Sequence, residues 1–578
     1  MIGSHTRLQD NQLQLFFRFL RRSILAILAA TGAIGAQLEP GTVGYGLTVM
    51  KGSRIDTFVV EILGTQRNGS LPGRDRILVR LSGLGLEKTG IIQGMSGSPV
   101  YVGERLLGAV AYGWSFANEP VGLVTPIEDM LEVLHRDLSG DEPTMETGAP
   151  ADPSEWQRLA SPLWVAGAGP ETLRLLTDLF EPMRLQPIAA ASGSGPVGGP
   201  ISPLQPGSAV GVQLVSGDLN IGGIGTVTHV AGKHLVAFGH EMIGSGAIDV
   251  PLTAIHIHGI LSNQSSSFKL GSATQVIGAA RQDRFSGVAA VTDERAQTLP
   301  LGIDVHTGTA TRHFSFELAR HRLYTTGLAQ VSLMGSLESA AKALGDASVR
   351  LALDVEFEDG RSLQWKRVYT GLNAPISAAL EVGKPLRALL QSGFADIRVA
   401  SVDAHLQVDE TVRVGRIDAA RLPRTTLVAG TTTELVVELV PFRKAPRTVA
   451  VPLRIPADAS GVVHIRVGSG RVAAEWERER LPRDKPANSG QLLRQLRQPV
   501  NDDELVVELI SETPGLAIDD REWPAPPPTI HRLLTETHRT GHVQPVPLRV
   551  LSRERVALDL VLQGELLLTV NIESKGSR

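Results

Sequence analysis

Apolar and polar residues alternate along most of the chain, which is the pattern of β-strands with one buried face. The alternating stretches are short and are separated by residues typical of turns. Helical segments are fewer, and we expect them at 126–135, 170–180, 376–391, 490–496 and 530–536. The strands with the clearest pattern lie at 44–50, 56–63, 76–81, 349–357, 433–440, 447–453 and 462–467. The chain is therefore predicted to be mainly β.

Changes in composition predict several structural units. Linkers rich in Pro and Gly, with a short βα unit between them, occupy 138–207 and separate the strand-rich segments 38–137 and 208–345. Residues 346–470 carry alternating strands at the spacing of a β-sandwich. Residues 471–578 begin charged and Pro-rich and return to strands, so we expect a smaller C-terminal α+β or β region there.

The N-terminal residues 1–36 have the composition of a targeting segment. Arg18, Arg21 and Arg22 precede a short apolar run that ends in small residues. This order predicts a secretory signal peptide. The run is short for a membrane-spanning helix, which needs ~20 apolar residues, and an uncleaved N-terminal anchor is the alternative. We therefore expect an exported protein of the bacterial periplasm or cell envelope, in membrane contact only through this segment if it is uncleaved.

Composition and charge exclude several classes of function. The 578 residues include 56 Lys and Arg against 60 Asp and Glu, so no basic excess points to nucleic acid. The chain has no cysteine, which excludes disulfides, a thiol nucleophile and a Cys-ligated zinc site. We expect no cofactor.

A glycine-flanked serine lies in the stretch Gly94-Met95-Ser96-Gly97-Ser98-Pro99. This is the local pattern of the nucleophile loop in trypsin-like serine peptidases, where it leads into a hairpin. Residues 99–111 form such a predicted hairpin around a turn at 103–104. The loop must expose the Ser96 hydroxyl and turn the N–H groups of Gly94 and Ser96 towards an oxyanion. The alternative is a glycine-rich turn with no chemical role.

A second hairpin is predicted over 222–240, with its turn at 231–232. Its second strand, 235–238, delivers His240 at its end. Histidine suits a general base because its unperturbed pKa is about 6.5. Many single histidines are structural, and the position of His240 after a hairpin is what makes it a candidate base.

The two stretches together resemble the SpoIVB-type serine peptidase family. The resemblance is carried by residues 90–99, 108–111, 225–228 and 237–240. It implies a trypsin-like two-lobed β-barrel in which 38–137 is the serine half and 208–345 the histidine half. It also implies that Ser96 is the nucleophile and His240 the base.

The chain departs from the family in two respects. Ser96 precedes His240, whereas the family's founding members have the histidine first, so the halves are expected in permuted order. The position of the family's aspartate is occupied by Ser82. Either another acid orients His240, or the site works as a dyad, or the site is weakened. We expect Asp249, which glycines at 244 and 246 could fold back, with Ser82 as the alternative.

His256 and His258 are the remaining chemical candidates, since they lie on one face of a predicted strand. Two imidazoles could bind a metal, but no third ligand has matching spacing, and we expect no metal site. The leading hypothesis is an exported serine endopeptidase acting on protein or peptide substrates. The competing hypothesis is a catalytically silent envelope scaffold that binds a protein partner through its β-sandwich.

Overall fold

The computed structural model describes the chain from residue 38 to residue 574, with gaps. The gaps are 115–116, 140–156, 160, 182–184, 190–202, 264–265, 309, 342–344, 482–484, 498–499, 519–520, 524–525 and 537–542. The predicted signal or anchor and most of both predicted linkers lie outside the described residues. Strands account for 54% and helices for 17% of the structure, which confirms a mainly β fold.

The serine half forms a closed barrel. Within the described residues its strand order is β4-β1-β2-β3-β6-β5, and β5 pairs back with β4. Side chains alternate between core and surface along β3, as the sequence pattern predicts. Helix α3 (Ile127–Leu134) follows the last strand, and its Met130 and Val133 share an apolar cluster with Ala109 of this half and Val236 of the histidine half. The strands are β1 (Val43–Lys51), β2 (Arg54–Leu71), β3 (Arg74–Ser82), β4 (Pro99–Val102), β5 (Arg105–Gly113) and β6 (Val121–Pro126), with the short helix α2 (Leu86–Thr89) after β3.

The histidine half forms a second closed barrel in the described part of the chain. Its order is β10-β13-β14-β15-β12-β11, and β11 pairs back with β10. Short strands from the linker region extend both barrels: β7 (Gln157–Arg158) pairs with β5, while β8 (Pro162–Ala166) and β9 (Gln186–Ala189) extend from β11. The barrel strands are β10 (Ala209–Gly217), β11 (Asn220–Ala231), β12 (His234–Ala237), β13 (Gly246–Leu261), β14 (Phe268–Arg284) and β15 (Gly287–Thr292).

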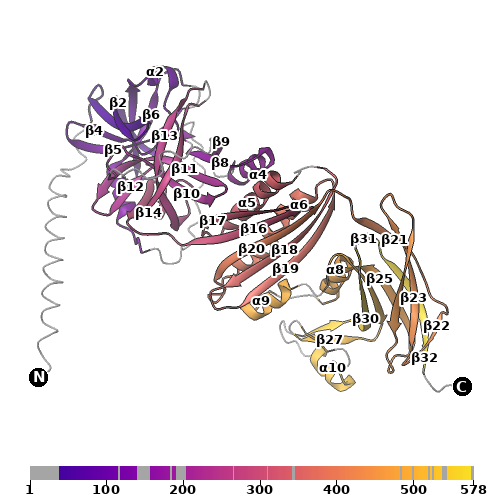
Figure 1. Cartoon of the computed structure of the whole chain (residues 1–578). Helices are drawn as coiled ribbons and strands as arrows, with labels where there is room; N and C mark the ends of the chain where they lie inside the picture. Colours follow the sequence, from indigo (N-terminus) through magenta and orange to yellow (C-terminus); the bar gives the residue numbers. More distant parts are fainter. Residues whose placement is uncertain are drawn as a thin grey trace, which may run out of the picture.

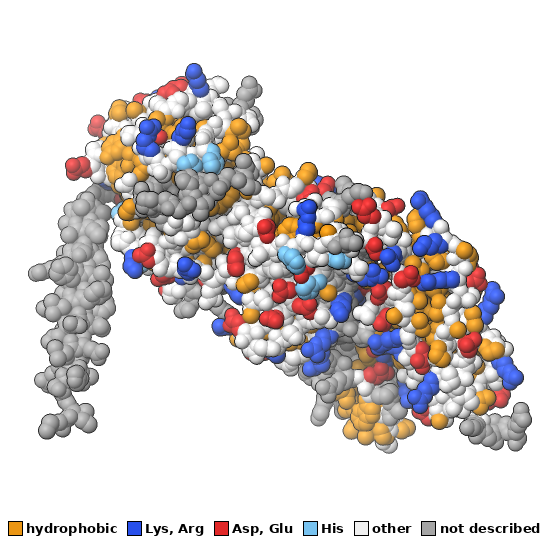
Figure 2. Space-filling view, in the orientation of Figure 1, with side chains coloured by type: hydrophobic (Ala, Val, Ile, Leu, Met, Phe, Trp, Pro, Cys, Tyr) orange, Lys and Arg blue, Asp and Glu red, His pale blue; other side chains and the backbone are white. Residues whose placement is uncertain are grey.

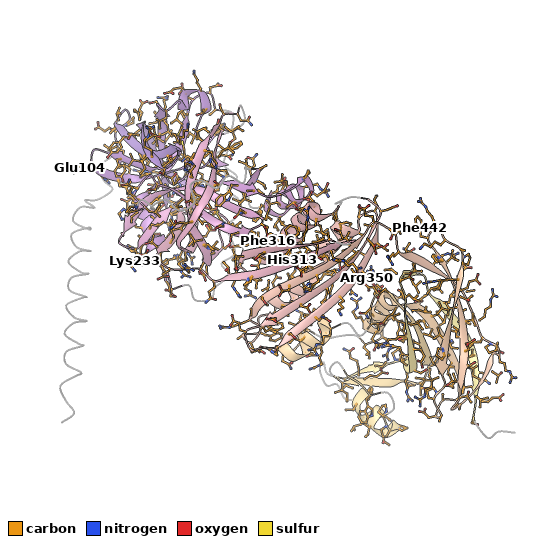
Figure 3. The ribbon with its side chains drawn as sticks, viewed as in Figure 1. Glu104, Lys233, His313, Phe316, Arg350 and Phe442 are labelled. Atoms are coloured by element: carbon orange, nitrogen blue, oxygen red, sulfur yellow. The ribbon has the colours of Figure 1, made fainter. Side chains whose placement is uncertain are left out.

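The two barrels lie against each other at one end of the molecule (Figure 1). Isolated bridges join Gly52 to Ile257 and Gln93 to Phe268, so backbone from each barrel pairs with the other. The turns of the two predicted hairpins, near Glu104 and Lys233, lie at the outer edge of the pair (Figure 3). This is the two-lobed arrangement that the resemblance implies.

The sheet of the histidine barrel continues, through pairing of β17 with β10, into an open sheet that we call the second sheet. Its order is β17-β16-β20-β18-β19, and β20 runs parallel to β16. Helices pack on one face of this sheet (Figure 1) and share its core. The elements are β16 (Thr298–Thr307), β17 (Ala310–Ala319), β18 (Ala347–Phe357), β19 (Ser362–Gly371), β20 (Val399–Asp409), α4 (Pro170–Phe180), α5 (Thr325–Ala340), α6 (Ala374–Glu381), α7 (Gly383–Leu390) and α9 (Ser489–Leu496).

The β-sandwich differs in extent from the predicted 346–470. Strands β18 to β20 belong to the preceding sheet, and the sandwich also recruits C-terminal strands from the predicted region 471–578. Its two sheets, β24-β23-β21-β31 and β22-β32-β25-β26-β30, enclose one apolar core. The strands are β21 (Val414–Arg421), β22 (Thr426–Val428), β23 (Thr432–Pro441), β24 (Arg447–Arg454), β25 (Gly461–Ser469), β26 (Glu504–Ser511), β30 (Arg549–Ala557), β31 (Val561–Gln563) and β32 (Leu566–Glu573).

A small sheet and two helices complete the C-terminal part. The sheet is β28 (Arg521–Trp523), β27 (Gly515–Ile518) and β29 (Val543–Val546). Helix α8 (Gly470–Arg480) follows β25, and α10 (Pro528–Glu536) follows β28. Across the described ranges, no helix combines the length and the apolar character that crossing a membrane requires.

Candidate active site

Ser96 lies in a tight loop between α2 and β4. Gly94 and Gly97 have φ of 91° and 90°, which other residues rarely adopt. Two short backbone bonds fold the loop: Met95 N–H donates to Ile92 O (3.0 Å), and Ser98 N–H donates to Met95 O (2.9 Å). The glycines on both sides of Ser96 therefore have a conformational cause.

Gly97 also lets the serine loop touch the histidine barrel. A Cβ at this position would lie 2.0 Å from Thr226 O and 2.4 Å from Phe238 N, so only glycine fits. Thr226 N–H donates to Ser96 O (2.9 Å), and Thr226 Oγ1 donates to Gly94 O (3.0 Å). Contacts at Gly94, Ser96 and Gly97 thus hold the loop against β11 and the segment that precedes His240.

His240 follows β12 after an unusual turn. Phe238 and Gly239 both have φ of 70°, and a non-glycine residue in this region costs about 1–2 kcal/mol. The cost is offset by burial, because the Phe238 ring packs on Gly225. Thr125 Oγ1 from the serine barrel donates to Gly239 O (2.6 Å). The turn that presents His240 is therefore held from both barrels.

The structure brings the segments of Ser96 and His240 together, since Gly97 touches Phe238. Both side chains are buried, with relative exposures of 0% and 1%. Among the described residues, Ser96 Oγ has no hydrogen-bond partner. The expected hydrogen bond between the hydroxyl and the imidazole is therefore not formed in this structure. Such bonds are often long without substrate and tighten when it binds.

A backbone carbonyl orients the His240 ring. Nδ1 lies 2.6 Å from Glu241 O. A carbonyl oxygen can only accept, so this contact requires the proton on Nδ1. In the neutral ring the basic lone pair is then on Nε2, which is the tautomer that a general base needs.

The two predicted orienting residues do not occupy this position. Asp249 binds Arg281 and the N–H of Gln297 (2.9 Å), and burial raises the pKa of its carboxyl. Ser82 ends β3, where it pairs with Val59. Neither side chain holds Nδ1 in this structure.

The predicted oxyanion donors have no competing acceptor. Among the described residues, the N–H groups of Gly94 and Ser96 donate no hydrogen bond, whereas the intervening Met95 N–H donates one. This arrangement leaves two nearby backbone donors for a ligand oxygen.

The sequence does not identify two buried polar residues of β14, Lys269 and Asp283, as neighbours of the site. Lys269 packs its methylene groups against Gly94, within 3.2–3.3 Å of where a Cβ would stand. Asp283 binds the turn after His240. The sequence gives no signal for either, because alternation predicts an ordinary strand lysine at the first position, and the charged run 281–284 suggests a surface turn at the second.

The comparison with protein families bears on this site. Residues 31–131 match the SpoIVB peptidase S55 family. The match confirms the predicted resemblance, covers the segment that carries Ser96 and supports a serine peptidase. His240 lies outside the matched residues, so the permuted order of the two halves stays a prediction. The comparisons with curated proteins and with solved structures give no significant match.

His256 and His258 do not gather a ligand set in the described residues. Their ring centroids are 5.3 Å apart, and His258 Nε2 lies 2.8 Å from Ser272 Oγ. No group of three or more potential metal-binding side chains occurs in the part of the chain that the structure describes.

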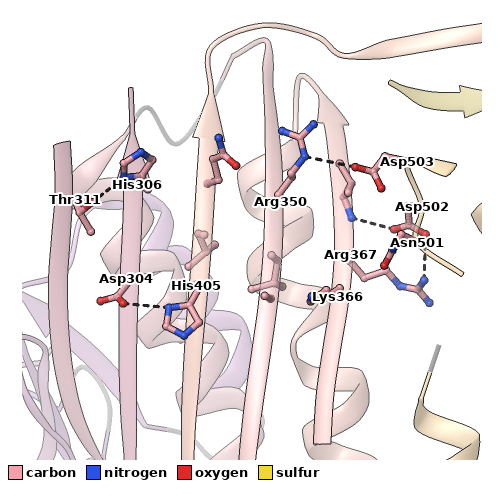
Figure 4. Close-up of a pocket in the computed structure, with 15 residues that line it drawn as sticks. Asp304, His306, Thr311, Arg350, Lys366, Arg367, His405, Asn501, Asp502 and Asp503 are labelled. Carbon is pink, nitrogen blue, oxygen red and sulfur yellow. Dashed lines mark hydrogen bonds and ion pairs between the residues drawn. The ribbon is translucent and has the colours of Figure 1, made fainter. Parts of the chain in front are cut away.

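A pocket of about 680 Å³ lies elsewhere, on the open face of the second sheet. Figure 2 shows histidines grouped with acidic and basic side chains on this part of the surface. Figure 4 shows the internal pairing of the pocket, including Arg350 with Asp503 (3.6 Å) and Arg367 with Asp502 (3.1 Å). In each pair the arginine lies on a strand of the second sheet and the aspartate lies in the segment before β26 of the sandwich. The pocket is therefore best explained as a junction between the second sheet and the sandwich.

Proposed function

We propose that the chain is an exported serine endopeptidase in which Ser96 is the nucleophile and His240 the general base. The observation that carries the proposal is the contact of Gly97 with Phe238, which places the serine loop beside the turn that presents His240. The family match over 31–131 supports the same chemistry. The apolar N-terminal segment supports export to the periplasm or cell envelope.

The reaction follows from the donors and acceptors at the site. Ser96 Oγ attacks the carbonyl carbon of a peptide bond while its proton passes to His240 Nε2. The N–H groups of Gly94 and Ser96 stabilise the oxyanion. The tetrahedral species collapses, the C–N bond breaks, and the leaving amine takes the proton from His240. Water, activated by His240, then hydrolyses the ester on Ser96 and releases the acid product.

The alternative is a catalytically silent envelope protein on the same scaffold. It is favoured by one observation, the buried Ser96 hydroxyl that has no bond to His240. In that case the β-sandwich would bind a protein partner. In the leading proposal the partner is a protein or peptide substrate.

Labelling with a fluorophosphonate distinguishes the two functions. The proposed peptidase forms a covalent adduct that peptide mass mapping places on Ser96. Ser96→Ala should abolish the adduct, and Ser98→Ala, which alters a buried serine of the same loop, should leave Ser96 reactive. Folded protein without a Ser96 adduct would support the silent scaffold.

A further inference from the structure

Asp283 lies on β14 and points into the turn that follows His240. Its side chain is buried, with 1% exposure. Oδ1 accepts from Met242 N–H (2.7 Å), and Oδ2 accepts from the N–H groups of Ile243 (2.8 Å) and Gly244 (3.0 Å). Successive N–H groups that converge on one carboxylate form an anion-binding nest. The charge of Asp283 therefore fixes the shape of this turn.

One peptide group of the turn connects Asp283 to His240. The N–H of the Glu241–Met242 peptide donates to Asp283, and its C=O lies 2.6 Å from His240 Nδ1. The peptide is planar, so fixing its N–H also fixes the direction of its carbonyl. A hydrogen bond at one end of an amide polarises the other end, and the two bonds strengthen each other. The carboxylate thus acts on the imidazole through a single rigid unit.

We propose that Asp283 is the acidic positioning residue of the Ser96–His240 site and acts on His240 through the Glu241–Met242 peptide. The inference rests on the proposed peptidase function and deepens it. This connection from Asp283 through the peptide to His240, which we call the relay, holds the Nδ1–H tautomer. It also supplies negative charge that stabilises the imidazolium formed during attack. A triad aspartate does both through direct contact. Here the aspartate is one peptide removed, and neither Asp249 nor Ser82 is needed.

Several other charged and titratable groups also lie around His240. The Tyr112 ring of β5 lies 6.5 Å from the His240 ring. Arg76 of β3 lies over Tyr112 and pairs with Asp129 of α3 (3.2 Å). Glu241 adjoins His240 in the chain. Burial raises the pKa of Tyr324, which precedes α5, and the charge of Asp283 raises it further. Variants of Asp283 retain all these side chains, although Asp283→Asn removes the charge that acts on Tyr324.

The test measures fluorophosphonate labelling of Ser96 against pH in the full chain. Asp283→Asn keeps the size of the side chain and removes the charge, and its single carbonyl oxygen can still accept from some of the three N–H groups of the turn. Labelling should slow by about 10- to 1,000-fold, less than the ~10⁴-fold loss seen when a directly contacting aspartate is replaced. The labelling rate rises with pH as the imidazole loses its proton. Removing a nearby negative charge destabilises the imidazolium, so the pH midpoint should fall by at least about half a unit.

Two further variants separate charge from shape. Asp283→Glu keeps the charge but displaces the nest, so the rate should fall at least about 5-fold while the midpoint stays. Asp218→Asn is the control, because Asp218, an exposed residue in the turn between β10 and β11, also binds a backbone N–H, that of Ser315 on β17 (2.7 Å). It should label at the wild-type rate. If Asp283→Asn fails to fold, Asp283→Glu alone decides, and a wild-type rate would overturn the inference.

The outcomes separate this inference from the function on which it rests. Wild-type protein that never labels overturns both. Wild-type labelling with an unchanged rate and midpoint in folded Asp283→Asn overturns the relay and leaves the peptidase standing. A purely structural Asp283 would lower the folded fraction in circular dichroism without moving the midpoint, and that result also overturns the relay.

Discussion

The burial of Lys269 predicts that the free energy of unfolding depends on pH. The side chain is fully buried behind the serine loop, and Nζ lies 2.8 Å from Thr48 Oγ1 and 3.5 Å from Thr226 Oγ1. Among the described residues, no carboxylate pairs with it. Burial therefore lowers the pKa of Lys269 from 10.5 to about 7. The folded protein holds a neutral amine at a pH where the unfolded chain carries an ammonium.

This difference makes stability depend on pH with a known sign. Between pH 7 and 10.5 the unfolded chain binds the proton and the folded chain does not, so the free energy of unfolding rises with pH. The slope is up to about 1.4 kcal/mol per pH unit, or about 2 kcal/mol from pH 8 to 9.5. The stabilisation is complete above the unfolded pKa and is lost as pH falls towards 7. Lys269→Met removes the titrating group and should remove this slope.

Urea unfolding at several pH values between 8 and 9.5 measures the effect. Trp164 is buried on β8 beside Gly222 of the histidine barrel and reports unfolding of that barrel. Trp164→Phe assigns the fluorescence change to this side chain. Taking the difference between wild type and Lys269→Met cancels other titrating groups. Equal slopes in the two proteins would refute the argument that Lys269 is neutral in the fold.

Two predictions concern the contact between the barrels. Gly97→Ala should cost more than about 3 kcal/mol and abolish labelling of Ser96, because the new Cβ meets Thr226 O at 2.0 Å. Gly73→Ala, at φ 79° in open space, should cost only about 1–2 kcal/mol. Urea unfolding compares the two variants, and equal losses of stability would contradict the contact between the barrels. Thr125→Val leaves Gly239 O without its donor, so stability should fall by about 1–3 kcal/mol. Labelling should also slow, and an unchanged rate would show that the donor does not position the turn.

The sequence predicts several local elements well, one of them in the site. The first hairpin, expected over 99–111 around a turn at 103–104, forms as β4 and β5, and the helix expected over 170–180 forms as α4. Both depend on short-range signals, which are turn residues in one case and a proline at the first helical turn in the other. The two-barrel fold followed from the family resemblance and not from the strand pattern.

Long-range pairing explains what the sequence did not predict. Alternation predicts β18 as a strand, but it does not show that β20 pairs in parallel with β16. Because β18 pairs with β20, both strands belong to the second sheet and not to the sandwich. Helix α5 is buried on nearly every side, so it lacks the polar face that marks a surface helix. Asp283 lies in a part of β14 that is buried on both faces, where alternation carries no information.

The structure of the phosphonylated protein is the most direct test of the central claim, that Ser96 and His240 form one catalytic site. We expect phosphorus bound to Ser96 Oγ and a phosphonyl oxygen ~2.7–3.1 Å from the N–H groups of Gly94 and Ser96. His240 Nε2 should lie within hydrogen-bond reach of an oxygen on the adduct. An adduct on another residue, or one on Ser96 with His240 turned away from it, would contradict the account.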